Sequence, residues 1–291
     1  MKVGIKHSRI WLFCTLAVAL CVSTNATGQT FTMIKSFGLS EGATPQSQLV
    51  QGADGTLYGA AGIIFKIQPD GTGFAVVKQF TNSVDGSGSV GGVTLSGSTL
   101  YGTTVSGPGS QRGSVFRMNI DGTGYTLLKI FTNSDGASID GAFPYASLTL
   151  SDNTLYGTTY LGGSSNLGVV FKVNTDGTAF AVLKNCNAID GSYPEAALVV
   201  SGSTLYGTTV NWGITGDGTV FKVNTDGTGF AVLKNFAFGE AANSFSAPAL
   251  SGTTLYGTTA QSDGVGRGTV FKINTDGTGF VVLRNFARSE G

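Results

Sequence analysis

The stretch TLYGTT stands at residues 204–209 and again at 99–104, 154–159 and 254–259, and TLYGAA stands at 56–61. A second motif, VFK or a close variant, follows each copy and contributes one phenylalanine per copy: Phe65, Phe116, Phe171, Phe221 and Phe271. The last three steps of this phenylalanine series are 55, 50 and 50 residues. Similarity at a fixed period of this length is typical of proteins built from repeated supersecondary units.

Each repeat contains four short segments that have the composition of strands. In the fourth repeat they are AALVVSG (196–202), STLYGTT (203–209), GTVFKVN (218–224) and GFAVLKNF (229–236), here called strands A, B, C and D. Val, Phe, Tyr, Leu and Thr fill these segments, and Gly, Asp, Asn and Ser bound them. Four-stranded units used in series predict an all-β fold, a β-propeller of about five antiparallel blades.

The repeats occupy nearly all of the chain after its first 28 residues. We expect one domain, 29–291, with units at about 43–80, 81–131, 132–186, 187–236 and 237–286. Apolar residues occupy both alternating positions of strands B and C, as expected for strands that are covered on both faces. A β-solenoid is the alternative, but its repeats are usually shorter and its strands parallel.

The heptad NTDGTGF, at 224–230 and 274–280, and its variant NTDGTAF at 174–180 join strand C to strand D. Asp-Gly between two apolar runs is a strong hairpin signal, and Gly accepts the positive φ of such a turn. A calcium loop would need an alternation of acidic residues that does not occur here, and a phosphate loop would need a following helix. We therefore interpret the heptad as a turn.

Two further residue types have structural interpretations. Gly within a strand is unfavourable, so the Gly of TLYGTT marks a bulge or a close backbone approach, and we expect crowding near the propeller axis to be the reason. Cys186 stands where other units have Phe80, Phe131, Phe236 and Phe286. We interpret it as a smaller core residue rather than a reactive thiol.

TLYGTT, GTVFKVNTDGTGF and the pattern LKNF…DG…P together resemble the GloVer-type tandem repeats of exported bacterial choice-of-anchor proteins. The resemblance covers about 31–286, because several motifs recur in the same order. It implies an exported, propeller-like repeat protein, generally with a C-terminal sorting or anchoring segment. No anchor follows the repeats in this sequence, and the family brings no established catalytic residues.

The first 28 residues have the layout of a secretory signal peptide: basic residues at 1–10, an apolar run at 11–23 and then small polar residues. Removal of this segment takes away His7, Cys14 and Cys21, and also three basic residues, so 17 − 3 = 14 basic residues face 17 acidic ones. A net charge of 14 − 17 = −3 gives no reason to expect a nucleic-acid partner. We expect a secreted or cell-surface protein that is not inserted in the membrane after cleavage.

The connections between strands differ in how much they vary. The A–B and C–D turns are nearly constant, whereas the B–C and D–A loops vary, and in a meandering blade these two variable loops share one rim. Variable loops on a rigid scaffold are where binding sites usually lie. The candidate binding residues in the B–C loops are two aromatic residues and four charged ones: Tyr160, Trp212, Arg112, Asp217, Asp263 and Arg267.

An aromatic face beside polar groups suits a sugar or a peptide. We therefore expect a non-catalytic propeller, without cofactor or metal, that binds carbohydrate or cell-surface protein through this rim. Alternatively, Trp212 has no ligand and caps its blade by packing on its own loop. A purely structural cell-surface spacer is a further alternative.

A polysaccharide hydrolase or lyase is the enzymatic alternative. The mature chain lacks histidine, which excludes Ser-His-Asp and Cys-His mechanisms, so catalysis would need two carboxylates. Glu195 and Asp217 are specific to one unit and are the candidates. The acidic residues that recur after strand D, Glu41, Asp85, Asp140 and Asp190, form either turn corners or a ring that could hold a cation.

Residues 31–37, FTMIKSF, match a D strand without strands A, B and C before them. The sequence 285–291, NFARSEG, aligns with 36–42, so the chain stops where a further strand A is expected to begin. We therefore expect a piece of a propeller with at least six blades, in which 31–37 is a loosely placed extra strand. A closed ring of five blades is the alternative.

Overall fold

The computed structural model describes residues 32–38, 42, 45, 47–81, 83–89, 91–132, 138–237, 240–261 and 268–286. The predicted signal peptide, Glu41, Asp263 and Arg267 lie outside these residues. The chain divides into Met1–Met33 and a compact unit, Ile34–Gly291, which contains every described strand. Within the described ranges there is no helix of the length and apolarity needed to cross a membrane.

Five sheets of four strands make up this unit, and we number them as blades 1 to 5. Blade 1 contains β1 (Val50–Gln51), β2 (Leu57–Ala60), β3 (Ile64–Ile67) and β4 (Ala75–Lys78). Blade 2 contains β5 (Val93–Ser96), β6 (Thr99–Thr104), β7 (Ser114–Asn119) and β8 (Thr126–Ile130). Blade 3 contains β9 (Thr149–Ser151), β10 (Thr154–Thr159), β11 (Val169–Asn174) and β12 (Ala181–Asn185). Blade 4 contains β13 (Val199–Ser201), β14 (Thr204–Thr209), β15 (Thr219–Asn224) and β16 (Ala231–Asn235), and blade 5 contains β17 (Ala249–Ser251), β18 (Thr254–Thr259), β19 (Thr269–Asn274) and β20 (Val281–Asn285).

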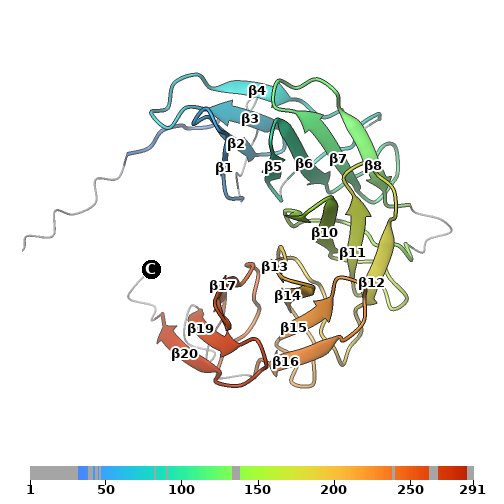
Figure 1. Cartoon of the computed structure of the whole chain (residues 1–291), viewed down its shortest axis with the longest axis vertical. Helices are drawn as coiled ribbons and strands as arrows, with labels where there is room; N and C mark the ends of the chain where they lie inside the picture. The colour runs from blue at the N-terminus through green and yellow to red at the C-terminus, as the bar shows by residue number, and fades with distance from the viewer. Residues whose placement is uncertain are drawn as a thin grey trace, which may run out of the picture. The chain divides into compact units, whose positions relative to one another are not determined.

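The strands of every blade pair in chain order, and every pairing is antiparallel. In Figure 1 the first strands, such as β1, β5, β13 and β17, lie innermost, and the fourth strands, β4, β8, β12, β16 and β20, lie outermost. The predicted all-β fold of five four-stranded antiparallel blades is confirmed. The antiparallel pairing also excludes the parallel β-solenoid.

The repeated heptad forms the turn between the third and fourth strands. In blade 3 the carboxylate of Asp176 accepts hydrogen bonds from the backbone N–H and the hydroxyl of Thr178, at 2.9 and 2.6 Å. Gly177 has a φ of 89°, which a residue with a side chain rarely adopts. The same carboxylate–threonine bonds recur in blades 4 and 5. The carboxylate therefore serves the turn, as the hairpin signal predicted.

The Gly of TLYGTT leaves space for an aromatic ring of the neighbouring strand. Gly157 of β10 pairs with Phe171 of β11, and a Cβ at position 157 would lie 2.5 Å from the ring. The equivalent distances in the other blades are 2.4 to 2.6 Å. Our expectation of crowding at the propeller axis is therefore wrong, because the close neighbour is the phenylalanine of the blade's own third strand.

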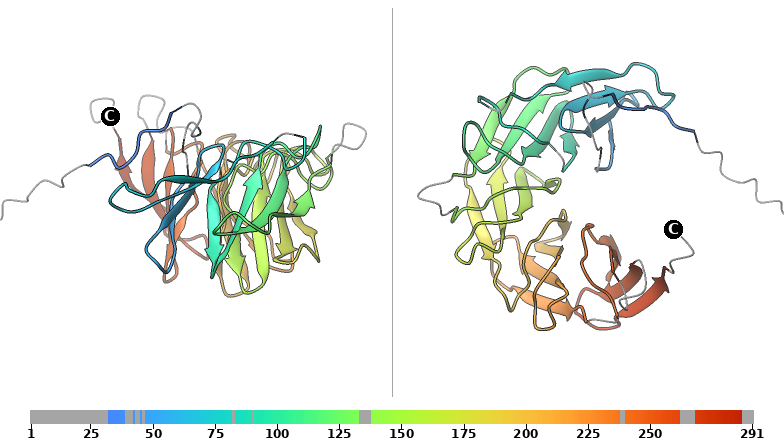
Figure 2. Two further views of the ribbon diagram at one scale, coloured as in Figure 1. Left: turned by 90° about the horizontal axis from the view of Figure 1, so that it is seen from above. Right: turned by 180° about the vertical axis from the view of Figure 1, so that it is seen from behind.

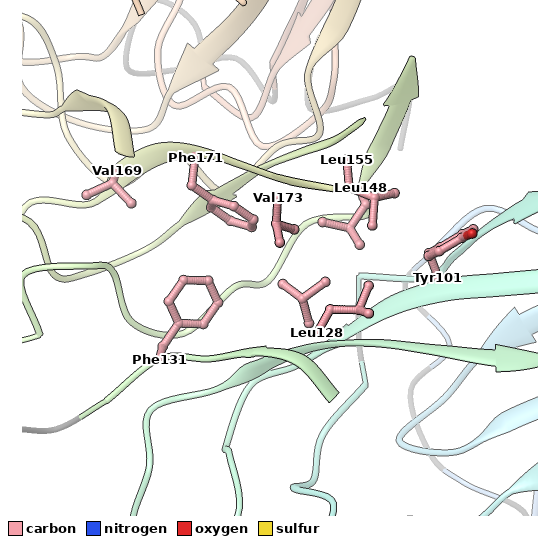
Figure 3. Packing of buried hydrophobic residues seen from close by; sticks show 9 residues of the cluster. Tyr101, Leu128, Phe131, Leu148, Leu155, Val169, Phe171 and Val173 are labelled. Carbon is pink, nitrogen blue, oxygen red and sulfur yellow. The ribbon is translucent and has the colours of Figure 1, made fainter. Parts of the chain in front are cut away.

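Apolar side chains of consecutive blades form one core per interface. Figure 3 shows the core between blades 2 and 3, in which Leu128 and Phe131 of blade 2 meet Leu148, Leu155 and Phe171 of blade 3. The Phe131 and Phe171 rings are 5.2 Å apart in an edge-to-face arrangement, which is favourable for aromatic pairs. Cys186 is buried at the position equivalent to Phe131, as its core interpretation predicted.

In the outer strands β4, β8, β12 and β16, a lysine forms an ion pair beside the same interfaces. Lys184 of β12 binds the carboxylate of Asp190 and lies 4.1 Å from the centre of the Phe230 ring in blade 4. The equivalent ion pairs are Lys78–Asp85, Lys129–Asp140 and Lys234–Glu240. The recurring acidic residues after strand D are thus neutralised by lysines at loop corners, which favours the corner interpretation over a cation-binding ring.

Residues 34–37, within the segment that matches a D strand, pack on blade 1 as a D strand would, although they form no strand. The Phe37 ring lies 5.0 Å from that of Phe65, and Lys35 lies 4.1 Å from the centre of the Phe74 ring. These contacts repeat those of Phe131 and Lys184 in later blades. The expectation of further blades stays a prediction.

Candidate functional site

The variable loops of each unit lie side by side on one rim. Short bridges join the D–A loop to the B–C loop, with Ala142 opposite Leu161 in unit 3 and Ser192 opposite Asn211 in unit 4. Figure 2 shows the strands of the blades running between two rims that carry the loops. The predicted sharing of one rim by the two variable loops is therefore observed.

One residue in the D–A loop of units 3, 4 and 5 links neighbouring units on this rim. The N–H of Phe143 donates to the carbonyl oxygen of Arg112 in the preceding unit at 2.7 Å, and its own carbonyl oxygen accepts from the N–H of Tyr160 at 3.0 Å. In the next unit, Tyr193 makes the same links to Leu167 and Val210, at 2.9 and 3.2 Å. Backbone hydrogen bonds thus join units 2, 3 and 4 along this rim.

These linking residues have an unusual backbone conformation. Phe143 and Tyr193 both have a φ of 57°, and Asn243 has a φ of 56°. Bulky residues rarely adopt positive φ, and such strain, of order 1–3 kcal/mol, concentrates at functional sites. In blade 2 the equivalent position is Gly88, with a φ of 71°, so the backbone conformation belongs to the repeat and the aromatic side chains are specific to units 3 and 4.

Three tyrosines of this rim form one cluster between blades 3 and 4. The Tyr160 ring lies 4.7 Å from that of Tyr193 in a tilted arrangement, and 5.6 Å from that of Tyr145 in an edge-to-face arrangement. Tyr160 follows β10, Tyr145 precedes β9, and Tyr193 precedes β13. The cluster combines one B–C loop with two D–A loops.

Glu195 lies beside this cluster. Its burial raises the pKa of its carboxyl group above the ordinary value. Burial, and then the charge of Glu195, raise the pKa values of the Tyr145 and Tyr160 hydroxyls. Among the described residues, no hydrogen bond or ion pair engages the Glu195 side chain.

Tyr145 of this cluster lines a hollow of about 770 Å³ beside the N-terminal ends of the first strands, whereas Tyr160 and Tyr193 are not among its described lining residues. Tyr145, Glu195 and Phe245 line it from blades 3, 4 and 5, each four residues before the inner strand of its blade. Ser47 and Gly91 line it from blades 1 and 2. One repeat position therefore carries a different side chain in each of the last three blades, at the place where they converge.

The sequence-predicted site residues fall in separate places. Tyr160 belongs to the tyrosine cluster. Trp212 is 48% exposed and has a φ of 61°, and its N–H bonds the carbonyl oxygen of Gly216 in its own loop. Arg112 lies over the ring of Phe143, with 5.6 Å from the guanidinium carbon to the ring centre. The carbonyl oxygen of Asp217 accepts the N–H of Asn243.

Sequence reasoning missed Tyr145 and Tyr193 and considered Glu195 only as half of a catalytic pair. All three lie in the segments FPY and YPE that end the D–A loops of units 3 and 4. A comparison of the repeats position by position could have found them, because the residue after Pro144 and Pro194 is not constant. No group of three histidine, cysteine, aspartate or glutamate side chains lies close enough to hold a metal in the part of the chain that the structure describes.

The profile of the Gloeobacter/Verrucomicrobia repeat matches residues 138–291. The chain belongs to this repeat family. The resemblance to GloVer-type repeats noted from TLYGTT and its neighbouring motifs is thus confirmed. No curated protein matches the chain by sequence.

Solved structures share the propeller fold. A chain of the nidogen/laminin complex is similar at a TM-score of 0.55 and 16% identity, over 83% of this chain and 79% of that one. TolB from Acinetobacter baumannii is similar at a TM-score of 0.55 and 14% identity, over 84% of this chain. The GH74 enzyme of Niastella koreensis is similar at a TM-score of 0.55 and 16% identity, also over 84% of this chain. This chain spans 54% of that TolB chain and 38% of the enzyme. At these identities the likeness shows the fold alone.

Proposed function

We propose that this repeat-family propeller is an exported, non-catalytic binding module whose ligand is a carbohydrate or a segment of a cell-surface protein. The ligand enters the hollow at Tyr145 and Glu195, beside which Tyr160 and Tyr193 pack. Export is supported by the signal-peptide layout of residues 1–28 and by the resemblance to exported repeat proteins.

The observation that carries the proposal is the contrast between uniform blades and a unit-specific cluster. The turns, the glycine–phenylalanine pairs and the lysine ion pairs recur from blade to blade, because they hold the fold. The tyrosine cluster and Glu195 occur once, and Tyr145 and Glu195 line a concave space of a size that accommodates a small ligand. Aromatic faces beside a carboxyl group can combine apolar contact with hydrogen bonding.

Binding is favoured over hydrolysis by the carboxylates of the hollow. Glycoside hydrolysis needs two carboxyl groups on opposite sides of the scissile bond, about 5–10 Å apart. Among the lining residues that the structure describes, Glu195 is the only carboxylate. Asp217, the other member of the candidate pair, is not among them.

A screen of the mature protein against immobilised glycans and cell-surface peptides tests the proposal. We expect binding that Tyr160→Ala reduces at least ~10-fold, since aromatic contacts dominate such sites. Ile214→Ala, which removes an exposed apolar side chain of the unit 4 B–C loop, is the matched control. Trp212→Ala tests whether binding depends on the B–C loop of unit 4 rather than on the tyrosine cluster. Binding that depends on Trp212 and not on Tyr160 would contradict the location, and binding to no ligand of the screen would contradict the function.

A further inference from the structure

Among the described residues that line the hollow, Glu195 is the one charged group, and no described residue pairs with its carboxylate. Glu195 is half-buried beside Tyr145 and Tyr160, and no described side chain makes an ion pair or hydrogen bond with it. Elsewhere in the fold, the buried Asp85 and the partly buried Asp140 and Asp190 each bind a lysine. These three carboxylates are thus paired within the fold, whereas the Glu195 carboxylate in the hollow is not.

The described lining of the hollow offers the Glu195 carboxylate no positive charge, so we expect its partner to be a cation rather than a neutral group. Among its described lining residues there is no lysine or arginine, and the polar groups besides Glu195 are serines, glutamine and a tyrosine hydroxyl. A carboxylate removed from water gains most from a counter-charge at hydrogen-bond distance. A ligand with an ammonium group would supply that charge.

The tyrosine rings are the second observation that points to a cation. Tyr160 and Tyr193 lie tilted at 34° to each other, and Tyr145 meets Tyr160 edge-on at 71°. Of the three rings, that of Tyr145 lines the hollow together with Glu195, and the negative face of an aromatic ring attracts a cation within about 6 Å. The fold already uses this contact at its interfaces, where Lys129 and Lys234 each lie 4.3 Å from the centre of a phenylalanine ring.

We propose that the site recognises a protonated amine, with Glu195 as its counter-ion and the ring of Tyr145, which packs against Tyr160, beside it. The inference rests on the proposed binding function of the same hollow and deepens it. The amine can belong to an amino sugar or to a lysyl side chain, which present the same ammonium group on different frames.

Ligands that differ only in the amine test the inference. We would measure binding of the mature protein to glucosamine oligosaccharides and to N-acetylglucosamine oligosaccharides of equal length, and to a lysine peptide and its acetyl-lysine form. Acetylation removes the charge and keeps the frame. We expect the amine form of one frame to bind at least ~10-fold more tightly than its acetylated form, and the frame that binds identifies the source of the amine.

Glu195→Gln supplies the protein side of the test, with Asp217→Asn as the control that removes another carboxylate of unit 4. We expect Glu195→Gln to abolish the preference for the amine form and Asp217→Asn to preserve it. Circular dichroism and the melting temperature show that both variants fold. Equal, Tyr160-dependent binding of the amine and acetylated forms would overturn the inference and leave the binding function standing. Binding of neither form, with no other hit in the screen, would overturn both.

Discussion

At the residue scale, the repeat depends on pairs of residues in which one leaves the space that the other fills. Gly157 faces the ring of Phe171 across β10 and β11, and a Cβ there would lie 2.5 Å from a ring carbon. The ring cannot move aside easily, because it is buried against Phe131 of the neighbouring blade. A β-branched or aromatic residue, otherwise favourable in a strand, is excluded from this position by packing.

We predict that Gly157→Ala lowers the free energy of unfolding by about 1–3 kcal/mol, because overpacking in a closed core forces neighbours to shift. Phe171→Leu alone also destabilises, since it removes ring contacts. The double variant should lose less stability than the sum of the two single losses, because the smaller leucine frees space for the alanine. Denaturant unfolding measures all three variants. Strict additivity would mean that the ring does not set the glycine requirement.

Cys186 permits a second prediction at this scale. Burial raises the pKa of its thiol to about 12, so almost no thiolate exists at mildly alkaline pH. In the chain without residues 1–28, Cys186 is the only cysteine. We expect iodoacetamide to leave the native protein unmodified and to modify it fully in concentrated guanidinium chloride. Rapid modification of the native protein would contradict the buried position.

At the element scale, the sequence predicted the regular parts of the fold well and the candidate site only in part. The hairpins were predictable because Asp-Gly between apolar runs leaves few turn geometries. Tyr160 was identified because it is an aromatic residue in a variable loop. Tyr145 and Tyr193 were missed because their proximity depends on two D–A loops meeting. The positive φ of Tyr193 could not be predicted either, because tyrosine rarely adopts this conformation.

Residues 34–37 make the side-chain contacts of a D strand although they form no strand. Phe37 lies on Phe65 and Phe74, at 5.0 and 5.9 Å between ring centres. We predict that Phe37→Ala destabilises blade 1 by about 1–3 kcal/mol, because it removes a half-buried ring from an apolar cluster. Hydrogen exchange should quicken in β2 and β3, and Ser36→Ala, at an exposed neighbour, should leave it unchanged. Unchanged exchange in Phe37→Ala would show that the segment contributes nothing to blade 1.

At the scale of the whole propeller, stability comes from a series of equivalent interfaces. Separate apolar clusters join blades 1 and 2, 2 and 3, 3 and 4, and 4 and 5. The outer face of blade 5 differs from its counterparts: Leu283 is 48% exposed and Tyr256 is 39% exposed, whereas Leu183 is 9% and Tyr206 8% exposed. Within the described residues, no apolar cluster joins blade 5 to blade 1.

This difference predicts unequal effects of one substitution at two equivalent positions. Leu183→Ala should cost about 2–4 kcal/mol, because it opens a cavity between blades 3 and 4. Leu283→Ala should change the free energy of unfolding by less than about 1 kcal/mol, because the side chain is already half in water. Thermal and denaturant unfolding of the two variants give the comparison directly. Equal losses would mean that the face of blade 5 is covered in solution.

The central claim is that a propeller of uniform blades carries one unit-specific binding site at its tyrosine cluster. Nuclear magnetic resonance of the mature protein with isotope-labelled tyrosine rings tests it most directly, during titration with an amine ligand from the binding series. We predict that the ring signals of Tyr145, Tyr160 and Tyr193 shift together with one affinity, while those of the interface tyrosines Tyr101 and Tyr206 stay in place. Shifts confined to other tyrosines, or binding that leaves all three cluster signals unmoved, would contradict the claim.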